Sequence, residues 1–219
     1  MNDGYRFHAR IYKILADRAL GPFRRELAAH IKKITGKNRG AAAGRVLDLG
    51  CGTGALLRDL KAAGADAVGL DNSSHMLRHI SGEFKVAAGS AGAAPFANGS
   101  FAVVVMSMLL HESDTAPTGI LAEAARLLEP GSGRLLILEW KLPERNLDYL
   151  FHPLMHGLEL CMGRRHYRNF RAFVRRGGPE GAIQRYNIKA AAGGAPELLI
   201  TKRTFLGLGA LILLEARLN

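Results

Sequence analysis

The residues whose types and spacing most clearly suggest a ligand site are one carboxylate and three glycines: Asp48, Gly50, Gly52 and Gly54. Glycines at alternate positions let the backbone turn tightly and let a ligand approach without meeting a Cβ atom. The run also satisfies the G-x-G-x-x-G/A pattern of dinucleotide sites. A carboxylate two residues before the first glycine would, however, repel a pyrophosphate and attract a cation. The loop therefore favours a nucleoside that carries positive charge.

A second acidic residue, Asp71, follows the first glycine by about 20 residues, the distance at which a carboxylate at a strand end accepts hydrogen bonds from ribose hydroxyls. S-adenosylmethionine has a ribose, an ammonium group and a sulfonium group, so it suits both acids. Ser73 or Ser74 is expected to cap a helix directly after Asp71. The two acids and the glycine loop together predict an adenosyl site.

The segments that must position these residues alternate between strand and helix patterns. An apolar strand at 46–49 runs into the glycine loop, and an amphipathic helix follows at 55–63. Further strands are predicted at 65–70, 84–88, 101–106 and 134–139, with a helix at 114–128 before the last of these. The segments 197–204 and 208–216 are expected to form a hairpin. This order predicts a doubly wound α/β sheet.

Four segments together resemble a known family: VLDLGCGTG, VGLDNSSHML, PFANGSF and LAEAARLLEPGSGRLLILEW. In order and spacing, residues 45–140 are similar to the class I S-adenosylmethionine-dependent methyltransferases, most of all to the small-molecule branch that includes quinone-biosynthesis enzymes (methyltransferase type 11). The resemblance implies a seven-stranded Rossmann-like sheet, mostly parallel, with a C-terminal antiparallel hairpin. It also implies one domain over residues 1–219, with a helical lid at 1–40 and a helical insertion at 141–194 that walls the acceptor pocket.

The resemblance implies a set of residues that contact the cofactor, drawn from the lid, the glycine loop and the following strand ends. Ser90 departs from the family, which commonly has an aspartate there for the adenine amino group. The expected cofactor-binding residues are Asp48, Gly50, Cys51, Gly52, Gly54, Asp71, Asn72, Met76, Ser90, Ala91, Ser107, Met108 and Tyr12.

Histidines supply the candidate catalytic and acceptor-pocket residues. His111 follows the strand at 101–106, where the resembled enzymes often carry a pair of histidines, and Glu112 could orient it; the alternative is a structural histidine that caps the next helix. His152 and His156 share a helix face. Because no third ligand is evident beside them, no metal is expected. The predicted acceptor pocket consists of Tyr5, His111, His152 and His156.

Charge and cysteine content bear on partners and compartment. The chain has 30 basic and 19 acidic residues, a formal net charge of +11. The segment Arg164–Arg176 is the most basic, and its aromatic residues lie at helical spacing. This pattern suits contact with an anionic surface or membrane as well as a solvated helix with a buried aromatic side.

Two cysteines provide no disulfide framework. The first 20 residues are charged throughout, so no signal peptide is expected and a cytoplasmic location is predicted; the oligomeric state stays open.

The function that these patterns predict is transfer of a methyl group from S-adenosylmethionine to a small-molecule acceptor by in-line displacement, leaving S-adenosylhomocysteine. Three alternatives stay open. An RNA methyltransferase would explain the arginines, but Ser107 to Leu110 lacks the aromatic-asparagine motif of base-modifying enzymes, so nucleic acid is less favoured. The departure at Ser90 is compatible with a non-catalytic adenosyl-binding protein. Nicotinamide-dependent reduction is disfavoured by Asp48.

Overall fold

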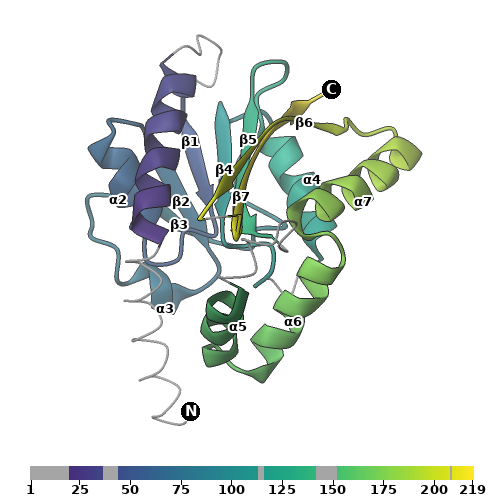
Figure 1. Cartoon of the computed structure of the whole chain (residues 1–219). Coiled ribbons are helices and arrows are strands. Elements are labelled where there is room, and N and C mark those ends of the chain that lie inside the picture. The colour runs from purple at the N-terminus through teal and green to yellow at the C-terminus, as the bar shows by residue number, and fades with distance from the viewer. Residues whose placement is uncertain (1–19, 37–43, 113–115, 142–151, 208) are drawn as a thin grey trace.

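A seven-stranded sheet forms the centre of the protein (Figure 1). The structure is a computed structural model, and it describes residues 20–36, 44–112, 116–141, 152–207 and 209–219. Tyr5, Tyr12 and most of the predicted lid therefore lie outside the described residues. The strand order is β3-β2-β1-β4-β5-β7-β6, in which β1 to β5 pair in parallel. The predicted doubly wound fold class is confirmed.

The strands lie close to the positions that the sequence predicts. The C-terminal hairpin pairs antiparallel within itself, and β7 also pairs antiparallel with β5. Strands β1 and β4 stand at the centre of the sheet and are almost entirely buried, which explains their continuous apolar sequences. The strands are β1 Val46–Leu49, β2 Ala67–Asp71, β3 Lys85–Ala88, β4 Val103–Ser107, β5 Arg134–Trp140, β6 Leu198–Leu206 and β7 Leu211–Leu218.

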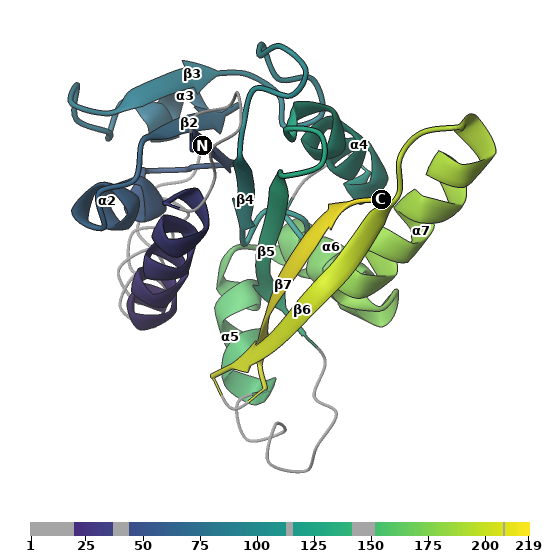
Figure 2. The same cartoon turned by 90° about the horizontal axis from the view of Figure 1, so that it is seen from above.

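Helices cover both faces of the sheet. Figure 2 shows the helix of residues 20–35 and α2 on one side, and α4 and α7 on the other. Leu27 and Ile31 of the first of these helices are fully buried in the core. The labelled helices are α2 Ala55–Ala62, α3 Ser74–Leu77, α4 Pro117–Leu127, α5 His152–Cys161, α6 Arg164–Arg175 and α7 Gly178–Gly193.

Parallel pairing brings the predicted site residues to one edge of the sheet. Because β1, β2 and β4 run in the same direction, the glycine loop after β1 lies at the same edge as Asp71 and Ser107, the last residues of β2 and β4. Asp48 lies opposite Gly69 in the β1–β2 register. A Cβ on Gly69 would lie 2.7 Å from Sγ of Cys51, so glycine there lets the loop pack against β2. This is the edge at which open α/β sheets bind ligands.

The arginine-rich segment forms a helix, as predicted, and its apolar side faces the protein. Phe170, Phe173 and Val174 of α6 are buried in the core, whereas its arginines are exposed. Phe170 and Phe173 are therefore not available for insertion into a membrane surface, whereas the arginine face is open to solvent. Among the described residues, no helix has both the length and the apolar character that crossing a bilayer requires.

Candidate active site

The glycine loop folds back over the end of β2. The backbone N–H groups of Gly50 and Cys51 both donate to the carbonyl of Leu70, at 2.8 and 3.0 Å. Gly50 has a φ of 82°, and a Cβ there would lie 2.6 Å from Cδ1 of Leu109. Gly52 has a φ of 54°, and a Cβ there would meet nothing within 4 Å. The loop is thus closely packed at its first glycine and open at its second.

Asp71 connects this loop to the end of β2. One carboxylate oxygen accepts a hydrogen bond from the N–H of Gly52 at 2.8 Å, and the other accepts one from the N–H of Ser73, also at 2.8 Å. A carboxylate oxygen has two lone pairs, so each keeps the capacity to accept a ribose hydroxyl. The same residue therefore holds the loop in place and presents acceptors at the sheet edge.

Asp48 is an acid inside the core. It is 1% exposed, and its Oδ2 has no hydrogen-bond partner among the described residues. Burial and the charge of Asp71 raise the pKa of Asp48 to about 7, while Arg24 lowers it. An unsatisfied buried carboxyl group is costly. A cationic or hydrogen-bond-donating ligand that reached Oδ2 would relieve that cost, as the ammonium group of S-adenosylmethionine would.

The other expected cofactor residues fall around this loop with different exposure. Cys51 is buried, and burial raises the pKa of its thiol, so the thiol stays protonated. Asn72 and Met76 are exposed beyond β2. Met108 follows Ser107 at the end of β4 and has a φ of 58°, an uncommon backbone conformation for a residue other than glycine that tends to mark functional sites.

At the expected adenine end, Ser90 is exposed and its hydroxyl accepts a hydrogen bond from the N–H of Gly92 at 3.2 Å. Ala91 is next to it and half-buried. The predicted contact of Ser90 with the cofactor stays a prediction.

A side-chain network that the sequence did not reveal anchors the segment after Ser90. Glu123 of α4 accepts a hydrogen bond from the N–H of Ala94 at 2.7 Å. Arg126, one turn further, donates to the carbonyls of Ala94 and Phe96 at 3.1 and 2.8 Å. Because Glu123 and Arg126 are about 30 residues away from Ala94 and Phe96 in the sequence, no local sequence pattern predicted these contacts. The network fixes the segment that follows Ser90, the position that the resemblance assigns to the adenine amino group.

His111 is completely buried at the end of the segment that follows β4, and the carboxylate closest to its ring belongs to β5. Its Nδ1 lies 2.6 Å from Oε1 of Glu139 in β5, while Oε1 of Glu112 is 4.0 Å from Nε2, beyond hydrogen-bond distance. Glu139 is therefore the carboxylate that forms a hydrogen bond with the His111 ring, and the orienting role of Glu112 stays a prediction. Burial alone would lower the pKa of His111, but Glu139 and Glu159 raise it well above its ordinary value. Its catalytic role stays a prediction.

Glu159 and His166 extend this group from the two following helices. Nε2 of His111 lies 3.6 Å from Oε2 of Glu159 in α5, and Nε2 of His166 in α6 lies 2.5 Å from the same oxygen. The indole N–H of Trp140 donates to Oε1 of Glu159 at 2.6 Å. Sequence reasoning missed Glu139, Glu159 and His166, because only the fold brings them to His111.

The helix histidines predicted for the acceptor pocket are partly described. Nδ1 of His156 lies 2.7 Å from the hydroxyl of Tyr167, and its ring packs edge-on against Phe170. His152 begins α5, but its side chain is outside the described part of the chain, as is Tyr5. The structure therefore places His156 between α5 and α6, near the His111 group.

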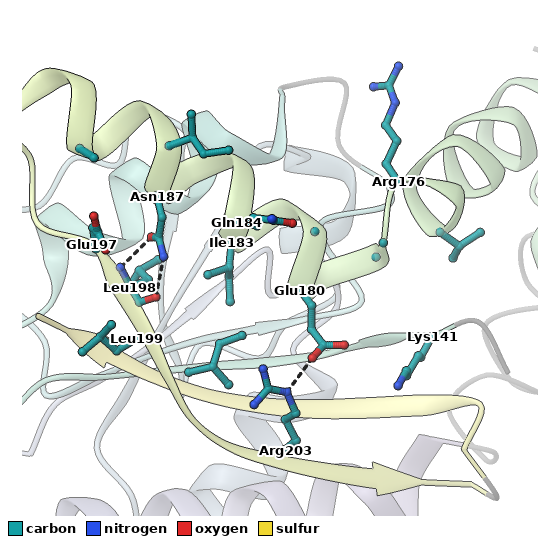
Figure 3. Close-up of a pocket in the computed structure, with 17 residues that line it drawn as sticks. Lys141, Arg176, Glu180, Ile183, Gln184, Asn187, Glu197, Leu198, Leu199 and Arg203 are labelled. Atoms are coloured by element: carbon teal, nitrogen blue, oxygen red, sulfur yellow. Dashed lines mark hydrogen bonds and ion pairs between the residues drawn. The ribbon is translucent and has the colours of Figure 1, made fainter. Parts of the chain in front are cut away.

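A large cavity lies elsewhere, between α7 and the hairpin strand β6 (Figure 3). Its volume is about 1080 Å³, and none of the predicted site residues lines it. Arg203 donates to Glu180 at 2.6 Å within it, and Asn187 forms two hydrogen bonds with the backbone of Leu198. The predicted cofactor site is at a different part of the sheet.

The sequence of the glycine-loop half matches known methyltransferases. Residues 46–131 match the family described as a methyltransferase domain. The demethylmenaquinone methyltransferase of Tropheryma whipplei is 36% identical over 123 residues, which are 53% of this chain and 51% of that protein. The ubiquinone biosynthesis O-methyltransferase of Aromatoleum aromaticum is 42% identical over 105 residues, 43% of this chain and 44% of that protein.

A solved structure shows the same fold over nearly the whole chain. The crystal structure of a putative S-adenosylmethionine-dependent methyltransferase from Methanococcus maripaludis has a TM-score of 0.63 and 16% identity, and the match covers 99% of this chain and 94% of that one. By contrast, the chain spans about half the length of the curated relatives that it matches. Residues 46–131 thus match a methyltransferase domain, the fold is that of a solved methyltransferase, and the resemblance recognised from the sequence is confirmed.

Proposed function

We propose that this protein transfers a methyl group from S-adenosylmethionine to a small-molecule acceptor. The observation that carries the proposal is the arrangement of two acids around the glycine loop. Asp71 braces the loop through Gly52 and keeps lone pairs at the sheet edge, and Asp48 lies buried behind it with Oδ2 unpartnered among the described residues. A ribose and an ammonium group would satisfy these two acids together.

The donor would supply an electrophilic methyl group whose displacement leaves a neutral thioether. In this proposal the open space at Gly52 admits the methyl donor. Asp71 accepts hydrogen bonds from the ribose hydroxyls of the donor, and Asp48 accepts a hydrogen bond from its ammonium group. Attack by a neutral or anionic acceptor on a sulfonium disperses charge, so alignment of the two atoms and exclusion of water provide much of the rate. Asn72, Met76, Ser90, Ser107 and Met108 complete the proposed binding surface.

The acceptor pocket is proposed to lie beside α5 and α6, within one domain that includes the lid at 1–40 and the insertion at 141–194. Two matched relatives are named for menaquinone and ubiquinone synthesis, which makes hydroxylated quinone-like rings the first acceptors to test. The two cysteines are free, one buried and one exposed, which suits the reducing cytoplasm in which we place the protein.

The direct experiment incubates the protein with methyl-labelled S-adenosylmethionine and a fractionated cell extract. The proposal expects label in the lipid or aqueous small-molecule fraction, and no transfer with an Asp71→Ala variant. Label in the RNA fraction, falling steeply as salt rises, would instead support an RNA methyltransferase that uses the exposed arginines of α6. Binding of donor and product with no labelled fraction at all would identify a non-catalytic adenosyl-binding protein.

A further inference from the structure

The buried group around His111 contains the donor atoms of a metal site. Nε2 of His111, Oε2 of Glu159 and Nε2 of His166 all lie within 4.8 Å of one another. They come from three separate parts of the fold: the segment after β4, helix α5 and helix α6. Figure 1 shows α5 and α6 side by side below the sheet. We propose that these three residues bind one divalent transition-metal ion, with Zn²⁺ as the reference ion.

The unpartnered nitrogen of His111 is the observation that points to a ligand. The side chain is fully buried, its Nδ1 is paired with Glu139, and its Nε2 has no hydrogen-bond partner among the described residues. That nitrogen points towards Oε2 of Glu159 at 3.6 Å, which is too long for a hydrogen bond. Tetrahedral zinc ligands at about 2.0 Å from the ion hold their donor atoms about 3.3 Å apart. The separation of these two atoms therefore suits an ion bound by both.

The surrounding residues provide the support that metal ligands usually have. A histidine that binds a metal commonly donates its other N–H to a carboxylate, which fixes the ring and its tautomer. Glu139 takes this part for His111 at 2.6 Å. The indole of Trp140 holds the second oxygen of Glu159 at 2.6 Å, so that Oε2 is the oxygen directed at the two histidines. Both glutamates are 0% exposed.

The ligand set also indicates the kind of ion. Two imidazoles and one carboxylate suit Zn²⁺, Fe²⁺ or Co²⁺ and are a poor match for Ca²⁺ or Mg²⁺, which prefer all-oxygen sites. Nε2 of His166 and Oε2 of Glu159 are at hydrogen-bond distance without an ion, so binding requires these two atoms to separate by about 1 Å. His166 is 14% exposed on its side chain, which gives it room to move.

Three protein ligands leave a position for water or for an oxygen of the acceptor. Use of that position by an acceptor rests on the proposed methyl transfer, whereas binding of the metal does not. The site and the proposed function are therefore tested separately, because the metal experiment needs neither donor nor acceptor.

The test is titration of the metal-stripped full chain with Zn²⁺, followed by dialysis, metal analysis and thermal unfolding. Wild type is expected to retain one equivalent and to unfold at a higher temperature with Zn²⁺ than without it. His166→Gln keeps a hydrogen-bond donor for Glu159 but removes the ligand, so its Zn²⁺ affinity should fall by more than about 100-fold, and that of Glu139→Gln by about 10- to 100-fold.

The matched control is His30→Gln. His30 pairs with Glu215 at 2.9 Å in the same kind of histidine–carboxylate contact, but the metal-ligand group does not include it. This control should keep the full equivalent of Zn²⁺. The proposal is overturned if wild type retains no metal, or if wild type, His166→Gln and His30→Gln bind Zn²⁺ equally. Circular dichroism of the metal-free variants separates loss of a ligand from loss of the fold.

Discussion

The acidic side chains at the glycine loop and those around His111 have different kinds of partner. At the glycine loop, Asp71 accepts hydrogen bonds from the backbone N–H groups of Gly52 and Ser73. Asp48 keeps one carboxylate oxygen, Oδ2, without a hydrogen-bond partner within the described structure. Around His111, buried carboxylates meet side chains instead, through Glu139 and Glu159. The first region is poised for a ligand that carries positive charge. The second already contains a cationic or metal-binding group of its own.

The comparison also separates short-range from long-range construction. The loop is built from one strand–turn–helix segment and is held by the end of the next strand, β2, so most of its signal lies in a local motif. The His111 group needs β5, α5 and α6 to assemble, so its stability depends on the whole fold. Changes in the second region should therefore affect folding most, and changes in the first should affect ligand binding most.

The largest effect on stability is expected for Glu139→Leu. It leaves His111 buried without the carboxylate that contacts Nδ1, and breaking a buried pair from one side costs about 3–5 kcal/mol in free energy of unfolding. Urea unfolding measures this value. Glu112→Gln, at the exposed neighbour of His111, should change it by less than about 0.5 kcal/mol. Equal effects of the two variants would contradict the assignment of Glu139 as the partner.

A pH-dependent effect is expected for Asp48→Asn. The carboxyl group has a pKa of about 7 in the folded chain against 3.8 as its ordinary value, because of burial and the charge of Asp71. Between these values the unfolded chain releases the proton while the folded chain keeps it, so wild-type stability falls as pH rises. The variant avoids this loss, which reaches about 4 kcal/mol near pH 8. Unfolding of both proteins between pH 4 and 8 measures the difference, and a gain that did not change with pH would contradict the account.

A smaller effect is expected for Gly50→Ala. A residue with a side chain costs about 1–2 kcal/mol in the left-handed conformation at Gly50, and its Cβ would also press on Leu109. Gly52→Ala is the matched variant, because Gly52 shares the positive φ but has open space around it. Chemical unfolding should therefore show a greater loss for Gly50→Ala. The reverse order would mean that Leu109 does not pack on the loop.

Most of the fold and the cofactor edge could be predicted from the sequence, because β1, the glycines and Asp71 carry their signal in local order. The antiparallel ending and the arginine-rich helix were also predicted, and the structure confirms both. Glu139, Glu159 and His166 could not be predicted, because nothing in their spacing marks them as neighbours of His111. Glu112 was the expected partner because it is adjacent in sequence, but its carboxylate lies beyond hydrogen-bond distance of Nε2.

The central claim is that the acids around the glycine loop hold an adenosyl cofactor, and calorimetric titration with S-adenosylhomocysteine tests it most directly. Wild type should bind the product, and Asp71→Ala should bind it roughly 10- to 100-fold more weakly, since charged hydrogen bonds contribute about 1.5–3 kcal/mol. Asp66→Ala is the control, because Asp66 is an exposed acid that pairs with Lys85 just before β2. Absence of binding by wild type, or equal affinity for wild type and Asp71→Ala, would contradict the account.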